Sequence, residues 1–348
     1  MLAGDGESEL GSRDISDYDG QRRFAGQGVL VVTERVAEQA CRASTFRKVS
    51  ALSVTCIAFT CACTERSELL GTAVSSPDAG VSDAATPPLT PPRFAPPVLV
   101  SALSNDAAID EDPSFTGDLL ELYFMSTRAG TKDIWSARRA LDSDPWGTPD
   151  RVMELSSTSD DWSPGVSLDG LSIWFATDRQ GGSGKIWQAT RAARTDVWSL
   201  PAAVAELSGS AVDFAPAVDA TETLLFFSSN RAGSAGFDLY AASRTSARVT
   251  WGVPRAIAGL NSASDEYDPF VAQGGLVVFF TSMRSGAGDL YWSARSSTEE
   301  AFRTPTRLTD LDSDAYDSDS SLSPDLSYMM FSSTRSGNAE IYETHSVE

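Results

Sequence analysis

The strongest constraint on the fold of this chain is a short segment that occurs five times. The copies read FMSTRAGTKDIW, FATDRQGGSGKIW, FSSNRAGSAGFDLY, FTSMRSGAGDLY and FSSTRSGNAEIY. One arginine in each copy marks the period, with successive gaps of 51, 52, 53 and 51 residues: Arg128, Arg179, Arg231, Arg284 and Arg335. A regular period of this length indicates a repeat protein in which each repeat is one supersecondary unit.

Other residue types recur at fixed places around these arginines. A phenylalanine lies four residues before each arginine and a glycine two residues after it, as Phe227 and Gly233 do around Arg231. An aliphatic residue followed by an aromatic one comes a few positions later. An acidic residue lies eighteen positions before each arginine: Asp110, Asp161, Asp213, Glu266 and Asp317.

Each repeat reads as a run of short strands. Segments such as LLELYFMSTR and TLLFFSSNR are rich in β-branched and aromatic residues and have the length of one strand. The glycine after each arginine supplies the positive φ of a tight hairpin turn. A second hairpin lies upstream, at Asp169-Gly170 in one copy, and a further short element such as WGTPDRVMEL lies downstream. Four antiparallel strands in a repeat of this length predict the blade of a β-propeller.

The repeat resembles the TolB-type, WD40-like propeller repeat. The shared features are the Phe-x-Ser-x-Arg strand end, the Asp-Ile-Tyr strand start and, more loosely, a Pro-x-x-Ser-Pro-Asp-Gly-like turn. The resemblance covers the chain from Phe94 to the C-terminus and implies a propeller of the bacterial envelope. Because that family is usually six-bladed, the number of blades must be counted from this sequence.

Five blades account for the whole repeat region. The leucines of the fourth strands, Leu155, Leu207, Leu260 and Leu311, are preceded one period earlier by Leu103 in RFAPPVLVSAL. The region therefore begins with an isolated outer strand at 94–103 and ends with a blade that lacks one. We expect an all-β, five-bladed β-propeller over residues 94–348, in which the N-terminal strand closes the last blade and leaves no open edge between first and last blade.

The residues before the propeller resemble an export signal and a tether. Residues 42–63 combine a basic flank with an apolar run that is too short for a membrane span but has the length of a signal-peptide core. The small residues before Cys63 resemble a bacterial lipoprotein signal, although Thr60 stands where leucine is usual, and imply that Cys63 is lipidated. A plain cleaved signal or a short buried helix are the alternatives. Residues 64–93 are rich in proline and small residues, which predicts a disordered tether.

Residues 1–41 form a polar extension ahead of this signal. Because an export signal should lie near the N-terminus, we expect translation to begin further in, at a valine or leucine codon, so that the extension is not translated. The localisation that follows is the cell envelope, as an outer-membrane lipoprotein or a periplasmic or secreted protein.

Composition excludes several classes of function. The formal net charge of −21 and a pI near 4.4 argue against binding to nucleic acid or to an anionic membrane surface. His345 is the only histidine, which argues against a Ser-His-Asp triad or a multi-histidine metal site. The four cysteines lie before residue 64, so no disulfide is expected in the propeller. We expect a monomer that contacts the membrane only through its lipid.

The repeated charges admit two interpretations. The five arginines, the five acids upstream of them and the acids that start the third strands should lie on one face of the propeller, where they could form a charged binding ring. Alternatively, they form arginine–carboxylate pairs that lock neighbouring blades. Because a position filled alike in every blade is better explained by architecture than by chemistry, we favour the structural interpretation.

Function should therefore lie where the repeats differ. The hairpin between second and third strands is longer in RQGGSGK and RAGSAGFD, and residues 310–321, DLDSDAYDSDSS, are rich in aspartate. Alternating aspartates offer the oxygen ligands that Ca²⁺ prefers, so Asp312, Asp314, Asp317 and Asp319 are candidate calcium ligands, with a solvated acidic loop as the alternative. No other cofactor is expected. We place the ligand-binding surface on the face that carries these hairpins and this segment.

These observations favour a non-catalytic binding module in the envelope that engages a protein partner. The alternative is a carbohydrate-active enzyme of the glycoside hydrolase kind, because five-bladed propellers include such enzymes and they need carboxylates that converge in the channel. The candidates are Asp110, Asp161 and Glu266. Acids that lie in the channel without an arginine partner would favour catalysis, whereas a symmetric ring of acid–arginine pairs would favour binding or scaffolding.

Overall fold

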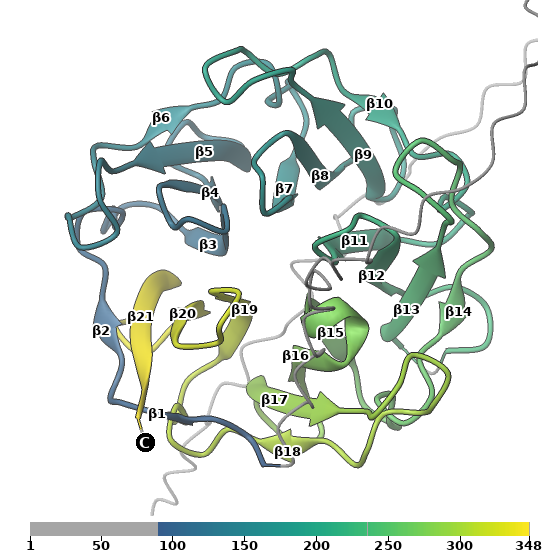
Figure 1. Ribbon diagram of the computed structural model, residues 1–348. Helices are drawn as coiled ribbons and strands as arrows, with labels where there is room; N and C mark the ends of the chain where they lie inside the picture. Colours follow the sequence, from purple (N-terminus) through teal and green to yellow (C-terminus); the bar gives the residue numbers. More distant parts are fainter. Residues whose placement is uncertain (1–89, 235, 348) are drawn as a thin grey trace, which may run out of the picture. The chain divides into compact units, whose positions relative to one another are not determined.

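The computed structural model describes residues 90–347 with the exception of residue 235. These residues form five antiparallel sheets arranged around a central channel, as Figure 1 shows. The predicted all-β, five-bladed propeller is therefore confirmed. The polar extension, the signal segment with Cys63 and most of the predicted tether lie outside the described residues. No helix in the described part of the chain is long and apolar enough to cross a membrane.

Each of the first four blades is built from consecutive strands. Blade 1 contains β3 (Asp110–Phe115), β4 (Glu121–Ser126), β5 (Asp133–Arg138) and β6 (Asp150–Arg151); blade 2 contains β7 (Asp161–Val166), β8 (Ser172–Thr177), β9 (Lys185–Thr190) and β10 (Ala202–Ala203). Blade 3 contains β11 (Asp213–Val218), β12 (Leu224–Ser229), β13 (Asp238–Ser243) and β14 (Arg255–Ala256). Blade 4 contains β15 (Glu266–Ala272), β16 (Val277–Ser282), β17 (Asp289–Ala294) and β18 (Thr306–Arg307), with the 3₁₀ turn η2 (Gln273–Gly275) after β15.

Blade 5 combines the two ends of the described chain. Its strands β19 (Asp317–Leu322), β20 (Tyr328–Ser333) and β21 (Glu340–Val347) are completed by β1 (Arg93–Phe94) and β2 (Val98–Leu99), which both pair antiparallel with β21. The outer strand is split in two at Pro96-Pro97, because proline cannot donate a ladder hydrogen bond. The predicted closure by an N-terminal strand is confirmed.

An ion pair secures the start of the closing segment. The guanidinium of Arg93 bonds the carboxylate of Asp310, which also accepts a hydrogen bond from the backbone N–H of Phe94 at 3.2 Å. The hydrogen bond from Arg93 is the main cause that lowers the pKa of Asp310. Phe94 itself is 4% exposed and packs into the core between blades 4 and 5.

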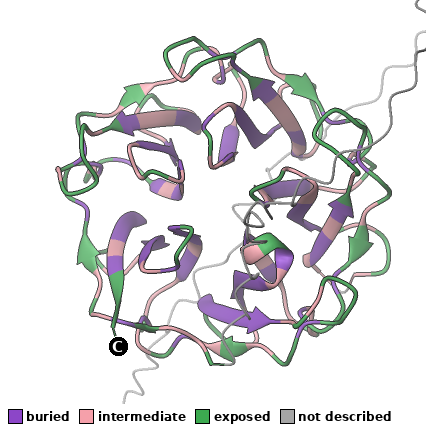
Figure 2. Cartoon of the chain, in the orientation of Figure 1, coloured by how far each residue is buried: buried purple, intermediate pink, exposed green. Residues whose placement is uncertain are grey.

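The repeated phenylalanines lie between blades. Each pair of neighbouring blades shares a buried hydrophobic cluster that contains one of these residues: Phe124, Phe175, Phe227, Phe280 and Phe331. All five are fully buried. Figure 2 shows the same distribution, with buried residues along the inner and middle strands and exposed residues on the outermost strands. The ring of clusters is continuous because one of them joins blade 5 to blade 1.

The repeated arginines are each held by four kinds of contact. Nη2 lies 2.5 to 3.0 Å from the carboxylate that precedes it by eighteen residues, and Nε donates to a serine or threonine hydroxyl two residues before it. Nη2 also donates to a leucine carbonyl in the connection from the preceding blade. The guanidinium lies over the repeated phenylalanine and over the aromatic ring of the third strand.

These contacts refine the structural interpretation of the charged residues. The arginine and its carboxylate belong to the same blade, so the ion pair does not itself cross between blades. The bond between blades is the one from the arginine to the leucine carbonyl, for example from Arg128 to Leu103. The five carboxylates are almost completely buried behind the arginines, with side-chain exposures of 0 to 2%. Buried carboxylates of this kind have little access to a ligand.

The fold makes a direct prediction for Phe227. Because its ring is 0% exposed in the cluster between blades 2 and 3, Phe227→Ala should lower the free energy of unfolding by about 3–5 kcal/mol, the usual cost of deleting a buried aromatic side chain. Urea unfolding measures the change. Leu200→Ala, at an 87% exposed side chain, is the control and should change stability by less than about 0.5 kcal/mol. Equal effects of the two substitutions would contradict this assignment.

Candidate binding site in the central channel

A β-bulge interrupts the inner strand of every blade at its third residue. The register of each inner strand shifts there, and the residue at the bulge has a φ between 48° and 58°. The five residues are Asp112, Ser163, Ala215, Asp268 and Asp319. A positive φ is uncommon for residues other than glycine, and aspartate tolerates it better than most. A bulge re-aims side chains, and these five line the central channel.

The bulge backbone is held by the neighbouring blade. The N–H of Asp112 donates to the hydroxyl of Ser332 at 3.1 Å, and the N–H of Asp268 donates to the hydroxyl of Ser228 at 3.0 Å. The N–H of Asp319 donates to the hydroxyl of Thr281 at 3.3 Å. In each case the hydroxyl comes from the second strand of the preceding blade. The positions of the three aspartates are therefore fixed before any ligand arrives.

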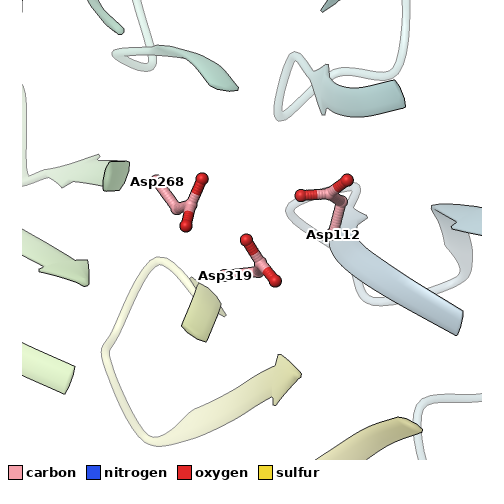
Figure 3. Close-up of side chains that lie close together, drawn as sticks. All are labelled: Asp112, Asp268 and Asp319. Atoms are coloured by element: carbon pink, nitrogen blue, oxygen red, sulfur yellow. The ribbon is translucent and has the colours of Figure 1, made fainter. Parts of the chain in front are cut away.

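These three aspartates meet in the channel. They belong to blades 4, 5 and 1, which are consecutive around the ring, and one carboxylate oxygen from each lies within 4.8 Å of the others. Figure 3 shows their carboxylates gathered in the space between the inner strands. Asp319, from blade 5, comes between Asp268 and Asp112 in this order around the ring. We call Asp112, Asp268 and Asp319 the channel aspartates.

The electrostatics of the channel aspartates is unfavourable. Burial is the largest cause that raises the pKa of Asp112 and of Asp268 well above the ordinary value, and the charge of Asp319 raises both further. Burial and the same charge also raise the pKa of the nearby Glu111 to about 7. Ser163 offsets part of the cost by donating from its N–H and hydroxyl to Asp112 at 3.0 and 3.2 Å. None of the channel aspartates forms an ion pair with an arginine in the part of the chain that the structure describes.

A cavity of about 240 Å³ lies against the channel aspartates. Much of its remaining wall is apolar, with prolines that follow four of the five bulge residues and side chains such as Phe115, Val166 and Phe270. The lining continues to the turns between first and second strands, at Leu168, Ala220 and Pro324. These turns lie at the opposite end of the inner strands from the arginines. The cavity therefore lies toward the face of the propeller opposite to the one that carries the second-to-third strand hairpins and residues 310–321. The sequence alone predicts the ligand-binding surface on that other face.

The structure does not bring the predicted calcium ligands together. Asp312 is paired with Arg307, and Asp317 is paired with Arg335 and accepts hydrogen bonds from Ser313. Asp314 is exposed. Of the four, Asp319 alone belongs to the channel aspartates. The acids considered for catalysis are also elsewhere, because Asp110, Asp161 and Glu266 are buried in arginine pairs within their blades.

Asp112 and Asp268 were not predicted from the sequence, although the repeat contains a signal for them. Both lie two residues after a repeated acid, and the same position in the other blades holds Ser163, Ala215 and Asp319. This position differs between repeats, as a functional position should. It escaped notice because the β-bulge, which directs its side chain into the channel, has no reliable sequence pattern of its own.

The fold and the channel together define a five-bladed β-propeller with an acidic centre, and known proteins share this fold. The endo-arabinase from Bacteroides thetaiotaomicron is 11% identical, with 72% of this chain and 97% of that one covered and a TM-score of 0.54. The catalytic domain of the GH62 α-L-arabinofuranosidase from Coprinopsis cinerea is 11% identical, with 74% and 97% covered and a TM-score of 0.50.

TolB proteins are also among the structural neighbours. TolB from Acinetobacter baumannii is 15% identical, with a TM-score of 0.45; the alignment covers 71% of this chain and 56% of that one. No protein-family model matches the chain, and no curated protein matches it. At these identities the structural similarities concern the fold alone, so function must be argued from the site.

The raised pKa of Asp268 predicts how stability depends on pH. The folded protein keeps this proton to a higher pH than the unfolded chain does, so stability falls as the pH rises from the ordinary aspartate pKa of about 4 through the raised pKa. The substitution Asp268→Asn removes the titrating carboxyl group, and with it this fall in stability at higher pH. In the presence of a chelator, the variant should be more stable than the wild type at about pH 7.5, and the difference should shrink toward about pH 4.

Urea unfolding at the two pH values measures this difference. Asp314→Asn, which removes an exposed acid from the same chain, is the matched control and should show no comparable gain. An Asp268→Asn variant that is less stable than the wild type at the higher pH would show that the carboxylate is favourably bonded in the folded state.

Proposed function

We propose that the chain is a non-catalytic binding module of the bacterial cell envelope, whose propeller engages a protein partner through the central channel. The observation that carries this proposal is the group of channel aspartates. At the bulge position three blades have aspartate and the other two have serine and alanine, so the side chains there do not follow the symmetry of the ring. The partner contacts the apolar wall of the cavity from the side of the turns between first and second strands. The acidic net charge of −21 favours a partner with a basic surface.

The spacing of the channel aspartates argues against an inverting glycoside hydrolase. Carboxylates that cleave a glycosidic bond lie roughly 5–5.5 Å apart in retaining enzymes and roughly 6.5–9.5 Å apart in inverting ones, because the sugar, and in inverting enzymes a water, must fit between them. One oxygen from each channel aspartate lies within 4.8 Å of the others. This separation is shorter than in inverting enzymes and lies just under the range of retaining ones.

A glycoside hydrolase is the second candidate. The structural neighbours named as an endo-arabinase and an α-L-arabinofuranosidase share the propeller fold with this chain. The channel aspartates are acids at the centre of the ring that have no arginine partner among the described residues. These are the features that the sequence analysis associated with catalysis. We favour binding because the carboxylates are closer than in inverting enzymes and because burial raises the pKa of both Asp112 and Asp268, which disfavours a charged carboxylate in the unliganded channel.

Two substitutions at alanines test the binding proposal. Ala220 is an exposed residue at the cavity lining, so Ala220→Trp should obstruct access to the channel, whereas Ala203→Trp adds the same side chain to the exposed outer strand β10. The immobilised protein should retain a specific partner from bacterial envelope extracts. Ala220→Trp should reduce this capture at least tenfold, and Ala203→Trp should leave it unchanged.

The same protein should be assayed against arabinan, xylan and aryl-glycosides. We expect no turnover above the uncatalysed rate. Hydrolysis of any of these glycans that disappears in Asp268→Asn would overturn the binding proposal in favour of the second candidate. Equal capture by both tryptophan variants would show that the partner binds outside the channel.

The envelope location in this proposal is supported by the sequence alone. The basic flank, apolar run and small residues before Cys63 resemble a lipoprotein signal. Labelled palmitate should therefore enter the protein in a bacterial host and be lost in Cys63→Ala. Cys61→Ala is the matched control and should keep the label. Incorporation that persists in Cys63→Ala would show that another residue carries the lipid.

A further inference from the structure

We infer that the channel aspartates bind a divalent cation with a preference for oxygen ligands, of which Ca²⁺ fits best, and that Ser320 lies at the edge of this site. This cation site is distinct from the one that the sequence suggested, because only Asp319 belongs to residues 310–321. The inference is independent of the proposed partner, since it concerns the binding of the ion itself.

The distances between the three carboxylates match the distances between oxygen ligands that share one Ca²⁺ ion. Oxygen ligands lie 2.3–2.6 Å from Ca²⁺, so two oxygens on the same ion are separated by at most about 5 Å. One oxygen from each of Asp112, Asp268 and Asp319 lies within 4.8 Å of the others. A single ion between the three side chains can therefore contact all of them without a change of backbone.

The type of ligand selects the class of metal. The group consists of carboxylates, and neither histidine nor cysteine is present in it. Carboxylate and other oxygen donors suit Mg²⁺, Ca²⁺ and Mn²⁺, whereas zinc and copper sites usually include imidazole or thiolate ligands. Three carboxylates fall short of the six to eight ligands that Ca²⁺ takes, so water or an oxygen of a bound molecule would complete the coordination from the cavity.

Ser320 provides a second and independent indication of a ligand. It is 6% exposed and lines the same cavity, and its hydroxyl oxygen has no hydrogen-bond partner among residues 90–347. Buried hydroxyls are normally bonded, and an unsatisfied one costs stability. The other four blades have proline at this position, after their bulge residues. Blade 5 therefore adds a hydroxyl next to Asp319, where it can bond the ion or a water on it.

The charge of the site needs compensation when the three channel aspartates are ionised. Three carboxylates meet without an arginine partner in the described part of the chain, and an ion pair or a bound metal is the usual means by which buried carboxylates remain charged. The repeated acids elsewhere in the propeller each have an arginine. A divalent cation would perform for the channel aspartates the role that arginine performs for those acids.

The test is a titration of CaCl₂ into the full chain after removal of ions with a chelator and dialysis. Calorimetry should show saturable binding of one ion, and the melting temperature should rise with the same concentration dependence. Asp268→Asn and Asp319→Asn should each weaken binding at least tenfold, and Ser320→Ala should weaken it severalfold. MnCl₂ and MgCl₂ titrations define the preference among oxygen-seeking ions.

Asp314→Asn is the matched control because it removes an exposed aspartate from residues 310–321 without altering the channel. It should leave Ca²⁺ binding unchanged. Binding that is lost in Asp314→Asn and kept in Asp268→Asn would place the ion on the acidic segment and overturn the inference. Absence of saturable binding of all three ions to the wild type would overturn it as well. Circular dichroism of each variant establishes that the propeller is folded.

Discussion

In every blade the guanidinium of the repeated arginine bonds a buried carboxylate, a hydroxyl and a leucine carbonyl while it lies against two aromatic rings. Removal of the arginine would leave its carboxylate buried without a partner, which would strongly destabilise the fold. The arginine thus permits an acid at the start of each inner strand. In several blades this acid also accepts a hydrogen bond from a backbone N–H in the connection that leads into the blade. The connections between blades, and with them the order of the ring, depend on this contact.

The uniformity of these pairs explains where ligand chemistry can occur. The arginine-bound acids hold the same position in all blades, and their side chains are almost completely buried. The bulge position, two residues further along each inner strand, has the same backbone conformation in five blades but different side chains. A scaffold that repeats its backbone and varies one side chain can place three acids on one side of a channel and Ser163 and Ala215 on the other.

Most of the fold could be predicted because its determinants are local and repeated. The phenylalanine, arginine and glycine recur at the same spacing, and the count of blades followed from Leu103 and from the missing outer strand at the end of the chain. The site could not be predicted in the same way. Asp112 and Asp268 are far apart in sequence, and their approach depends on the closure of the ring and on the bulge that turns them inward. The acidity of residues 310–321 drew attention to neighbours of Asp319 whose charges are used by Arg307 and Arg335.

The closing of blade 5 by β1 and β2 also determines when the propeller can become a closed ring during synthesis. These strands leave the ribosome before the rest of the propeller, but their partner β21 is the last strand of the described chain. Blades 1 to 4 can form in the order of their translation, while the first strands wait as an unpaired edge until the end of the chain is available. Since Asp112 comes from blade 1 and Asp319 from blade 5, the channel aspartates assemble only at this final step. Chains that stop short of β21 would carry most of the fold and none of the completed site.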